Sequence, residues 1–402
     1  MTIRKRTQVG IIGAGPAGQL LARLLHRSGI DVVVLERRTR GYVEGRIRAG
    51  VLEQGTAAVL KLAGAADRMT TDGLEHDGFS IAFDNRMARV DLREYGNSPV
   101  FVYGQTEITK DLNRLNEADG IEVHYDVEAC SVTGLDADAA MVTYRVDGNE
   151  RDLACDYVAG CDGYHGVSRR SMPDRVLREY EKVYPFGWLG VLSNTRPASH
   201  ELVYSNHPRG FALCSQRFTT VSRNYIQVPA EERVEAWSDE AFWDELRRRL
   251  PAEVADTLET GPSIEKSIAP LRSFIAEPLR CGRMFLVGDA GHIVPPTGAK
   301  GLNLAASDAA MLASALVAWY SGKDPAGLER YSATALDRIW KAERFSWWFT
   351  IASHRLSDNP FDQRMQVAEL DYYTGTRAGL TSIAENYVGL PIEDPVTGQP
   401  IV

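Results

Sequence analysis

A glycine-rich turn between two apolar segments near the start of the chain constrains the fold most. Residues 9–12 are apolar, the turn that follows contains Gly13, Gly15 and Gly18, and a second apolar segment ends at Glu36. In a βαβ unit these glycines give, in order, a tight turn, a close approach of the backbone to a pyrophosphate, and close packing of helix on strand. An acid about 20 residues later accepts a hydrogen bond from a ribose hydroxyl. The pattern predicts an α/β, Rossmann-like fold that binds a dinucleotide.

Length and composition restrict the class of protein. The chain has 402 residues, of which 44% are hydrophobic, and its formal net charge is −9. Such a chain can form roughly two or three domains, and its charge argues against a nucleic-acid partner. We expect no membrane segment, because no apolar run approaches about 18 residues, and a cytoplasmic location, because no cleavable hydrophobic leader precedes the first strand. The five cysteines are odd in number and lack a CxxC pair, so neither disulfides nor a metal site is expected.

Periodicity and turn signals indicate the remaining elements. A hairpin is predicted over 79–92, with Asp84 and Asn85 at its turn, and a helix over 238–250, with Ser238 as its N-cap. The segment 183–228 alternates like several strands, and we interpret it as a sheet domain inserted into the nucleotide-binding fold. Other helices are expected at 52–69, from 111 onwards, at 302–320 and at 331–356, and other strands at 121–125, 140–146, 157–163 and 284–289. The aromatic helix 331–356 is expected to be buried or to form an interface, and a mixed tail follows it.

Three apolar strands, far apart in the sequence, each lead to a glycine and an acid. The first unit ends at Glu36, the second at Asp162 and the third at Asp289. Strand ends meet at the ligand crevice of a doubly wound sheet, so the three would line one extended cofactor. Asp289 would accept from a polyol hydroxyl, and the helix that begins near Gly298 would direct its positive end at the ring beyond. A flavin, which becomes an anion on reduction, benefits most from that position.

Several segments of the chain resemble the single-component aromatic flavoprotein hydroxylases. Besides the fingerprint and the turns at 161–163 and 288–290, these are 45–55, 184–188, 207–217 and 384–391, which match members of the family that act on 4-hydroxybenzoate. The resemblance covers essentially the whole chain. It implies an enzyme that uses FAD, NADPH and O2 to convert 4-hydroxybenzoate to 3,4-dihydroxybenzoate through a flavin hydroperoxide, with NADH as an alternative donor. It also implies a homodimer.

The same resemblance implies a division of the α/β chain into three parts. A FAD-binding domain is expected from residues 1–73, 100–180 and 270–346. An inserted, mainly β substrate-binding domain is expected from 74–99 and 181–269, and a C-terminal helical or interface segment from 347–402.

The cofactor-binding residues follow from the motifs together with the resemblance. Asn303 and Arg48 resemble contacts to the flavin ring and its surroundings, and Arg223 resembles an arginine whose charge affects the position and reduction of the flavin. The expected cofactor-binding residues are Gly13, Gly15, Gly18, Glu36, Arg37, Arg46, Arg48, Gln105, Asp162, Arg223, Asp289, Lys300, Gly301, Leu302 and Asn303.

One strand carries the candidate carboxylate anchor. With a period of two, Phe211, Leu213, Ser215 and Arg217 share a face, which sets a hydroxyl and a guanidinium about 7 Å apart above an apolar floor. This suits an aromatic carboxylate, because the Arg217 fork can hold a carboxylate through two bonds and Ser215 can donate a third. The resemblance adds Tyr225 on the neighbouring run. The alternative is that Arg217 serves a structural ion pair.

The resemblance assigns four residues to the phenol end of the substrate. Tyr204 and Tyr387 match the paired tyrosines of the family, His76 matches a histidine that passes a proton to solvent, and the Pro296 carbonyl, in a turn that exposes it, resembles a further acceptor. A phenol with a pKa near 10 is only about one part in a thousand ionised at neutral pH, yet the phenolate is the reactive form. A chain from substrate through Tyr204, Tyr387 and His76 would stabilise that anion. Taken singly, such tyrosines are typical of a core and such a histidine of a surface.

An arginine cluster is not explained by the dinucleotide fingerprint. Because the chain has no second GxGxxG motif, the nicotinamide cofactor is expected in a surface groove that holds it by charge. The residues that resemble this groove are Arg37, Arg38, Tyr42, Arg46, His165 and Arg272. Arginines near the adenosine end favour a 2′-phosphate, and therefore NADPH over NADH. For Arg40 taken alone, the alternative to cofactor binding is that it belongs to a solvated basic loop.

Two other functions stay open at this point. The chain could hydroxylate another phenolic acid, because one pocket side chain can change the accepted ring pattern, or it could be a flavin-binding sensor that binds a ligand without turnover. The set of Tyr204, Tyr387 and Arg217 opposes both. An absorbance titration with 4-hydroxybenzoate, followed by product analysis, distinguishes the three.

Overall fold

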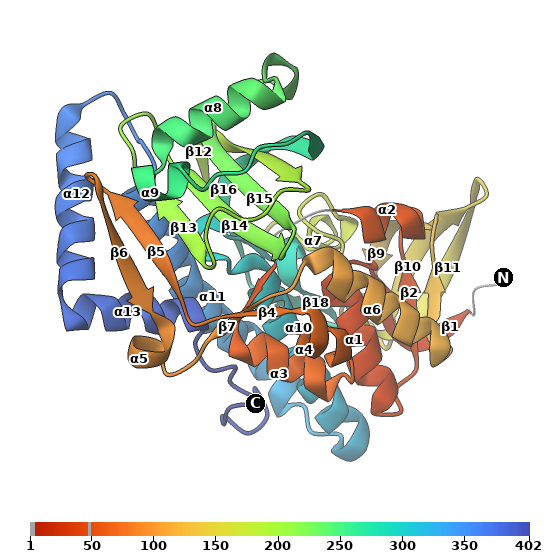
Figure 1. The fold of residues 1–402 in the computed structure, drawn as a ribbon. Coiled ribbons are helices and arrows are strands. Elements are labelled where there is room, and N and C mark those ends of the chain that lie inside the picture. Colours follow the sequence, from red (N-terminus) through yellow and green to blue (C-terminus); the bar gives the residue numbers. More distant parts are fainter. Residues whose placement is uncertain (1–4, 47–49) are drawn as a thin grey trace.

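The computed structural model of the chain, drawn as a ribbon in Figure 1, describes residues 5–46 and 50–402. The flavin contact expected of Arg48 therefore lies outside the described residues. The described strands form two eight-stranded sheets and one three-stranded sheet. In Figure 1 most of the first sheet lies on the right, the second at the upper left, and helix α12 at the left edge.

The first sheet is a doubly wound parallel sheet. Its parallel strands, in spatial order, are β18 (Met284–Leu286), β11 (Asn149–Gly160), β1 (Arg6–Ile12), β2 (Val32–Leu35) and β8 (Glu122–His124). Antiparallel strands β17 (Arg280–Cys281), β10 (Ala140–Val146) and β9 (Glu128–Thr133) extend it. All four residues of β2 are buried, as expected for a parallel strand covered on both faces. Helix α1 (Pro16–Arg27) packs against α6 (Gln105–Ala118) and α10 (Gly301–Gly322).

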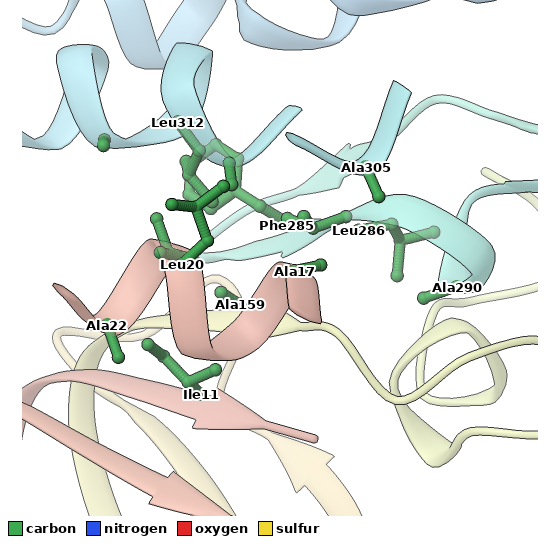
Figure 2. Close-up of a cluster of buried hydrophobic side chains, with 14 of the residues drawn as sticks. Ile11, Ala17, Leu20, Ala22, Ala159, Phe285, Leu286, Ala290, Ala305 and Leu312 are labelled. Atoms are coloured by element: carbon green, nitrogen blue, oxygen red, sulfur yellow. The ribbon is translucent and has the colours of Figure 1, made fainter. Parts of the chain in front are cut away.

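The core under the first sheet joins segments far apart in the sequence. Figure 2 shows Leu20 of α1, Phe285 of β18, and Ala305 and Leu312 of α10 gathered around Ala17 and Ala159. Helix α10 is long and apolar enough to cross a bilayer, but 72% of its most apolar stretch is buried inside the protein, as in a core helix.

The second sheet is mostly antiparallel. Its strands, in spatial order, are β19 (His292–Ile293), β16 (Ser263–Glu277), β12 (Arg178–Ser193), β15 (Val221–Pro229), β14 (Ala212–Phe218), β13 (Leu202–Ser205), β5 (Gly78–Phe83) and β6 (Arg86–Asp91). One face packs Tyr204 and Phe211 toward the C-terminal helices, and the other packs Val203 and Ala212 toward α8 (Asp239–Arg249). This alternation confirms the strand period expected for 183–228.

The remaining elements are a small third sheet, several short helices and three 3-10 turns. The small sheet consists of β3 (Val51–Leu52), β7 (Val100–Val102) and β4 (Leu74–His76). The short helices are α2 (Arg40–Gly45), α3 (Gln54–Leu62), α4 (Asp67–Asp72), α5 (Leu92–Gly96), α7 (Val167–Arg170) and α9 (Ala252–Ala255). Single 3-10 turns are η1 (Val234–Ala236), η2 (Gly288–Ala290) and η3 (Pro296–Gly298).

Local signals were sufficient for some elements and wrong for others. The hairpin turn at Asp84 and Asn85, both with positive φ, is confirmed, as is the Ser238 cap, whose hydroxyl accepts from the Ala241 N–H at 3.0 Å. The single helix expected at 52–69 is wrong. It is replaced by β3, α3 and α4, because Gly64 turns the chain at φ +63°.

The C-terminal segment 347–402, expected to be helical or to form an interface, is mostly helical. Helix α11 spans Ala326–Ser353, and the tail expected to be mixed contains α12 (Pro360–Gly375) and α13 (Arg377–Val388). Helix α11 continues through the boundary expected between residues 346 and 347. Strands β12 and β16 likewise run through the boundaries expected near 180 and 270, and β16 contributes to both cores, with Leu271 in the second and Phe274 in the first.

Candidate functional site

The glycine-rich turn has the geometry that a dinucleotide site requires. Gly13 has φ +103°, and a Cβ there would collide with the Cys161 carbonyl, while a Cβ on Gly18 would collide with the Gly13 carbonyl. A Cβ on Gly15 would instead meet no atom of residues 5–46 or 50–402 within 4 Å. Gly13 and Gly18 are therefore required by the protein itself, whereas the open side of Gly15 is where a pyrophosphate would approach.

Glu36 fixes the turn from the end of β2. Its carboxylate is buried and accepts from the Ala14 N–H and the Arg38 N–H, each at 2.8 Å. Each carboxylate oxygen has a second lone pair, so these bonds orient the group and leave it able to accept from a hydroxyl.

Asp162 and Asp289, at the ends of the other two strands, differ in exposure. Asp162 accepts from the N–H and the hydroxyl of Ser168, both at 2.9 Å, and burial raises the pKa of its carboxyl group. Asp289 is exposed, in the turn η2 that follows β18. Because β1, β11 and β18 are parallel neighbours, both acids and the Gly13 turn lie at one edge of the sheet.

The start of α10 approaches the same edge. A Cβ on Gly288 would lie 3.0 Å from Ala305, in the second turn of α10, and 3.7 Å from Ala17 of α1. Gly301 begins α10 with no atom within 4 Å of an added Cβ among the described residues, and Leu302 beside it is half buried. The first turns of α1 and α10 contain no acidic residue. Their N–H groups thus favour an anionic ligand.

Lys300 and Asn303 connect α10 to its surroundings. Lys300 Nζ lies 2.6 Å from Glu53 Oε1 and donates to the Tyr387 carbonyl at 3.0 Å. Asn303 donates to the carbonyls of Val51 and Ala299 and accepts from the Glu53 N–H at 2.9 Å. Burial lowers the pKa of the Lys300 ammonium, against the pull of the Glu53 carboxylate. These side chains position the segments around α10, which the sequence alone did not indicate.

These features fit FAD. Gly15 and Gly301 leave room beside two helix N-termini, Glu36 and Asp289 offer acceptors for hydroxyls, and all of them lie along one strand edge. Gln105 begins α6 beside this region and is half buried, and Arg37 and Arg46 are exposed.

The candidate carboxylate anchor is a buried corner of the second sheet. Arg217 Nη1 donates to the Gln216 carbonyl at 2.9 Å, and its guanidinium also bonds Tyr225. Arg223 pairs with Glu265 and lies over the Tyr225 ring, with its Cζ 5.1 Å from the ring centroid. Burial would raise the pKa of Tyr225, but the charges of Arg223 and Arg217 outweigh it and hold the pKa below its usual value.

Ser215 lies where the strand period places it, and its hydroxyl has a protein partner. It donates to the Arg223 carbonyl at 2.6 Å. The side chain is buried in the sheet that carries Leu213 and Tyr204, which are directly paired across β14 and β13.

The two expected tyrosines meet although they are far apart in the sequence. Tyr204 and Tyr387 are fully buried, their hydroxyl oxygens are 2.9 Å apart, and burial raises the pKa of both. His76 is buried too, and its Nε2 lies 2.9 Å from Gln216 Oε1. Its Nδ1 has no hydrogen-bond partner among the described residues, so the structure does not join His76 directly to Tyr387.

Pro296 lies in η3, on the side of the second core. Its carbonyl accepts from the Ala299 N–H at 2.9 Å and has one lone pair left for another donor. Thr297 Oγ1, next to it, lies 2.9 Å from Thr350 Oγ1, so α11 supports this turn.

The residues expected for the nicotinamide cofactor form two groups. Arg37, Arg38 and Arg46 are exposed around α2, with the Arg38 Cζ 5.2 Å from the Tyr42 ring centroid. His165 and Arg272 form the second group with Tyr164, whose ring lies 4.9 Å from the His165 ring and 4.5 Å from the Arg272 Cζ. Arg40 instead bonds Glu44 and Glu117, at 2.7 and 2.8 Å.

Two sets of buried contacts near the site are not indicated by the sequence. Glu53 bonds both Lys300 and Arg338, each at 2.6 Å. His354 accepts from the Trp188 indole N–H at 2.7 Å and stacks between Phe186 and Phe211. The only local signal was the position of Glu53 and Trp188 within segments that resemble the family, because contacts across such sequence separations leave no periodic pattern.

Comparisons with known proteins agree with this geometry. A family model described as "FAD binding domain" matches residues 6–346. The p-hydroxybenzoate hydroxylase of Acinetobacter baylyi is 51% identical over 390 residues, 96% of each chain. A 3-(3-hydroxy-phenyl)propionate/3-hydroxycinnamic acid hydroxylase of Burkholderia cenocepacia is 27% identical over 79% of this chain and 58% of its own length.

Among solved structures, p-nitrophenol 4-monooxygenase from Pseudomonas putida superposes with a TM-score of 0.77 at 21% identity, over 96% of this chain and 99% of its own. That likeness shows the fold, and it confirms the expected α/β class. The family match covers most of the chain, and the relative at 51% identity covers nearly all of it. The chain belongs to the family of single-component, FAD-dependent aromatic hydroxylases.

Proposed function

We propose that this hydroxylase acts on 4-hydroxybenzoate and places a hydroxyl at the 3-position, giving 3,4-dihydroxybenzoate. The observation that carries the proposal is the buried hydroxyl pair of Tyr204, on the sheet that also carries Arg217, and Tyr387 of α13. The relative from Acinetobacter baylyi, named for the same substrate, supports it.

The spacing along β14 suits a benzoate with a para hydroxyl. Tyr204 pairs with Leu213, and Arg217 follows four residues later, about 13 Å along the strand. A 4-hydroxybenzoate with a hydrogen bond of about 2.8 Å at each end spans roughly 12 Å between the two protein partners. The ligand would thus reach from the guanidinium to the tyrosine pair.

In this proposal the anchor residues bind and orient the ring. Arg217 holds the carboxylate through its planar fork, and Tyr225 donates beside it. The Ser215 hydroxyl, which donates to the Arg223 carbonyl, turns toward the carboxylate to add a third bond. FAD, when bound, takes a hydride equivalent from NADPH and supplies the activated oxygen.

The tyrosine pair would handle the phenol proton. Burial keeps both hydroxyls neutral, because it raises their pKa values, so they pass a proton on and do not store a charge. Burial also lowers the pKa of His76, which keeps that ring neutral and able to accept. A water, or a turn of the ring away from Gln216, would complete the path from Tyr387. The Pro296 carbonyl would accept from the substrate hydroxyl at the same end.

The test is to measure NADPH oxidation and 3,4-dihydroxybenzoate formation with and without 4-hydroxybenzoate. We expect fast oxidation only with substrate, and a product-to-NADPH ratio that drops strongly in Tyr204→Phe while substrate still binds. Tyr144→Phe, a buried tyrosine in the first core, serves as the control and should keep the ratio. Equal NADPH oxidation with and without substrate would contradict the proposal. Turnover of another phenolic acid alone, or binding without turnover, would favour the two alternatives.

We further infer that the enzyme is a cytoplasmic homodimer that binds neither nucleic acid nor membrane. Phe361, Met365 and Tyr372 of α12 are 65%, 52% and 65% exposed, and a second copy would cover them. Light scattering measures the molar mass in solution. We expect the mass of a dimer for the wild type and the mass of a monomer for the double variant Phe361→Ser/Met365→Ser. A monomeric wild type would contradict it.

A further inference from the structure

A buried carboxylate in the middle of α10 has no role in the chemistry described so far. Asp308 is 1% exposed, and the same oxygen, Oδ2, accepts from the Gly288 N–H at 2.9 Å and lies 2.7 Å from His292 Nε2. An apolar residue would be the ordinary choice at such a position, because burying a charge is costly unless its partners compensate it. The partners of Asp308 therefore indicate what it does.

Gly288 is the first residue of the turn that presents Asp289. It has φ +60°, which a residue with a side chain adopts only under strain, and Asp289 follows it as an exposed carboxylate. The bond from the Gly288 N–H to Asp308 holds this turn against α10. Helix α10 also begins at Gly301, beside the cofactor edge, so one carboxylate ties together two of the segments expected to meet FAD.

His292, in β19, is the second partner of the Asp308 carboxylate. Burial would lower the pKa of this histidine, but the carboxylate of Asp308 outweighs that effect and raises it. When His292 is protonated, its charge compensates that of Asp308. His292 is itself 1% exposed, so the pair is shielded from solvent.

We propose that Asp308 is a positioning residue for FAD: by bonding Gly288 and His292 it holds Asp289 where that carboxylate accepts from the polyol chain of the cofactor. The proposal rests on the proposed contact of Asp289 with FAD. It concerns binding of the cofactor only, so its failure is distinguishable from failure of the hydroxylation assay.

The experiment is a double-mutant cycle on FAD affinity, measured by fluorescence titration of the FAD-stripped protein. We expect Asp289→Asn to weaken FAD binding by about tenfold or more and Asp308→Ala to do the same. In the Asp289→Asn background, Asp308→Ala should then cost less than about twofold, because the group that it positions is gone. Equal losses in both backgrounds would show a merely structural role and overturn the proposal, as would an unchanged affinity in either single variant.

Two further measurements distinguish loss of the polyol contact from a general loss of structure. ADP lacks the polyol chain, so its affinity should change less than about twofold in Asp308→Ala; an equal loss for ADP and FAD would overturn the proposal. If Asp308→Ala does not fold, His292→Leu and His292→Gln replace it, since glutamine can still donate to Asp308 and leucine cannot. Loss of FAD affinity in the leucine variant with rescue in the glutamine variant is expected, and equal behaviour would contradict the proposal. Ser307→Ala is the matched control, because this buried neighbour donates to the Leu304 carbonyl of its own helix, α10.

Discussion

At the carboxylate anchor, two guanidiniums and one phenol share a buried corner of the second sheet. Glu265 pairs with Arg223, and burial lowers the pKa of the Arg217 guanidinium. A substrate carboxylate bound here would accept charge-assisted hydrogen bonds from the planar fork of Arg217. The strand period alone indicated Arg217 and Ser215. The hydrogen bond from the Ser215 hydroxyl to the Arg223 carbonyl could not be predicted, since it depends on the register between β14 and β15.

Arg217→Lys tests the anchor at the scale of one residue. Lysine keeps the charge but loses the planar fork, so the Kd for 4-hydroxybenzoate should rise by more than about tenfold while FAD content stays normal. A spectral titration of the bound flavin measures it. The control is Arg196→Lys, at an exposed arginine paired with Glu259, which should leave the Kd for 4-hydroxybenzoate unchanged. An unchanged Kd in Arg217→Lys would show that Arg217 does not bind the substrate carboxylate.

Glu343 on α11 shows how a single buried carboxyl affects stability. Burial raises its pKa to about 7, and it outweighs the hydrogen bond to Ser273 and the charge of His292, which both lower the pKa. The folded protein therefore keeps this proton up to about pH 7, whereas the unfolded chain loses it near the ordinary value of 4.5. The stability contributed by Glu343 is complete below pH 4.5 and is lost as the pH rises through 7.

Glu343→Gln should remove that loss. Relative to the wild type, the free energy of unfolding of the variant should improve between pH 5 and pH 8 by about 1–3 kcal/mol. Denaturant unfolding at the two pH values measures it. Glu329→Gln on the exposed side of the same helix should show no such change. A parallel pH dependence in wild type and Glu343→Gln would mean that the carboxyl ionises normally.

At the scale of elements, α11 supports the substrate side of the molecule. It carries Thr350, which bonds the turn of Pro296, and His354, which accepts from Trp188, follows its last residue. Trp188 in turn packs against Tyr225, with ring centroids 5.0 Å apart. Burial lowers the pKa of His354 to about 3, so the ring stays neutral and its Nε2 remains an acceptor.

His354→Leu should therefore destabilise the protein by about 1–3 kcal/mol, because the buried indole N–H loses its acceptor. His354→Gln can restore that acceptor and should lose less. The free energy of unfolding at pH 7 measures both. Equal losses in the two variants would mean that stacking with Phe211, and not the hydrogen bond, accounts for the effect.

The elements also show why some structure was predictable from sequence and some was not. Residues 79–92 and the cap at Ser238 carry their information locally, in a turn dipeptide and a capping side chain. Helix α12 was missed because only Gln366 and Leu370 are buried along its 16 residues, which gives it no apolar stripe.

At the scale of the whole molecule, long-range contacts bring the candidate site together. Tyr204 and Tyr387 are 183 positions apart, and Glu53 and Arg338 are 285 apart. No periodic signal encodes such pairs, so only the resemblance to a family linked Tyr204 with Tyr387. The strand-edge placement of Glu36, Asp162 and Asp289, in contrast, followed from the rule that parallel strands end at one edge.

The proposed groove for the nicotinamide cofactor also belongs to this scale, because its residues come from both large sheets, with His165 following β11 of the first. Arg37 and Arg38 follow β2 in the first sheet, whereas Arg272 lies on β16 in the second and bonds Glu181 at 3.1 Å. The chain as a whole is acidic, with a net charge of −9, so a local cluster of arginines is effective only within about 8–10 Å of its ligand. Such a cluster would recognise a phosphate and not the nicotinamide ring.

Arg37→Ala combined with Arg38→Ala should therefore separate the two nicotinamide cofactors. The KM for NADPH should rise by more than about tenfold, because a charged contact to the 2′-phosphate is worth roughly 1.5–3 kcal/mol, whereas the KM for NADH should change by less than about threefold. Steady-state rates with 4-hydroxybenzoate present measure both. Arg40→Ala is the matched control, since this arginine lies in the same segment but is already bonded to Glu44 and Glu117. If the double variant affects NADPH and NADH alike, these arginines do not recognise the phosphate, and the preference for NADPH must come from elsewhere on the surface.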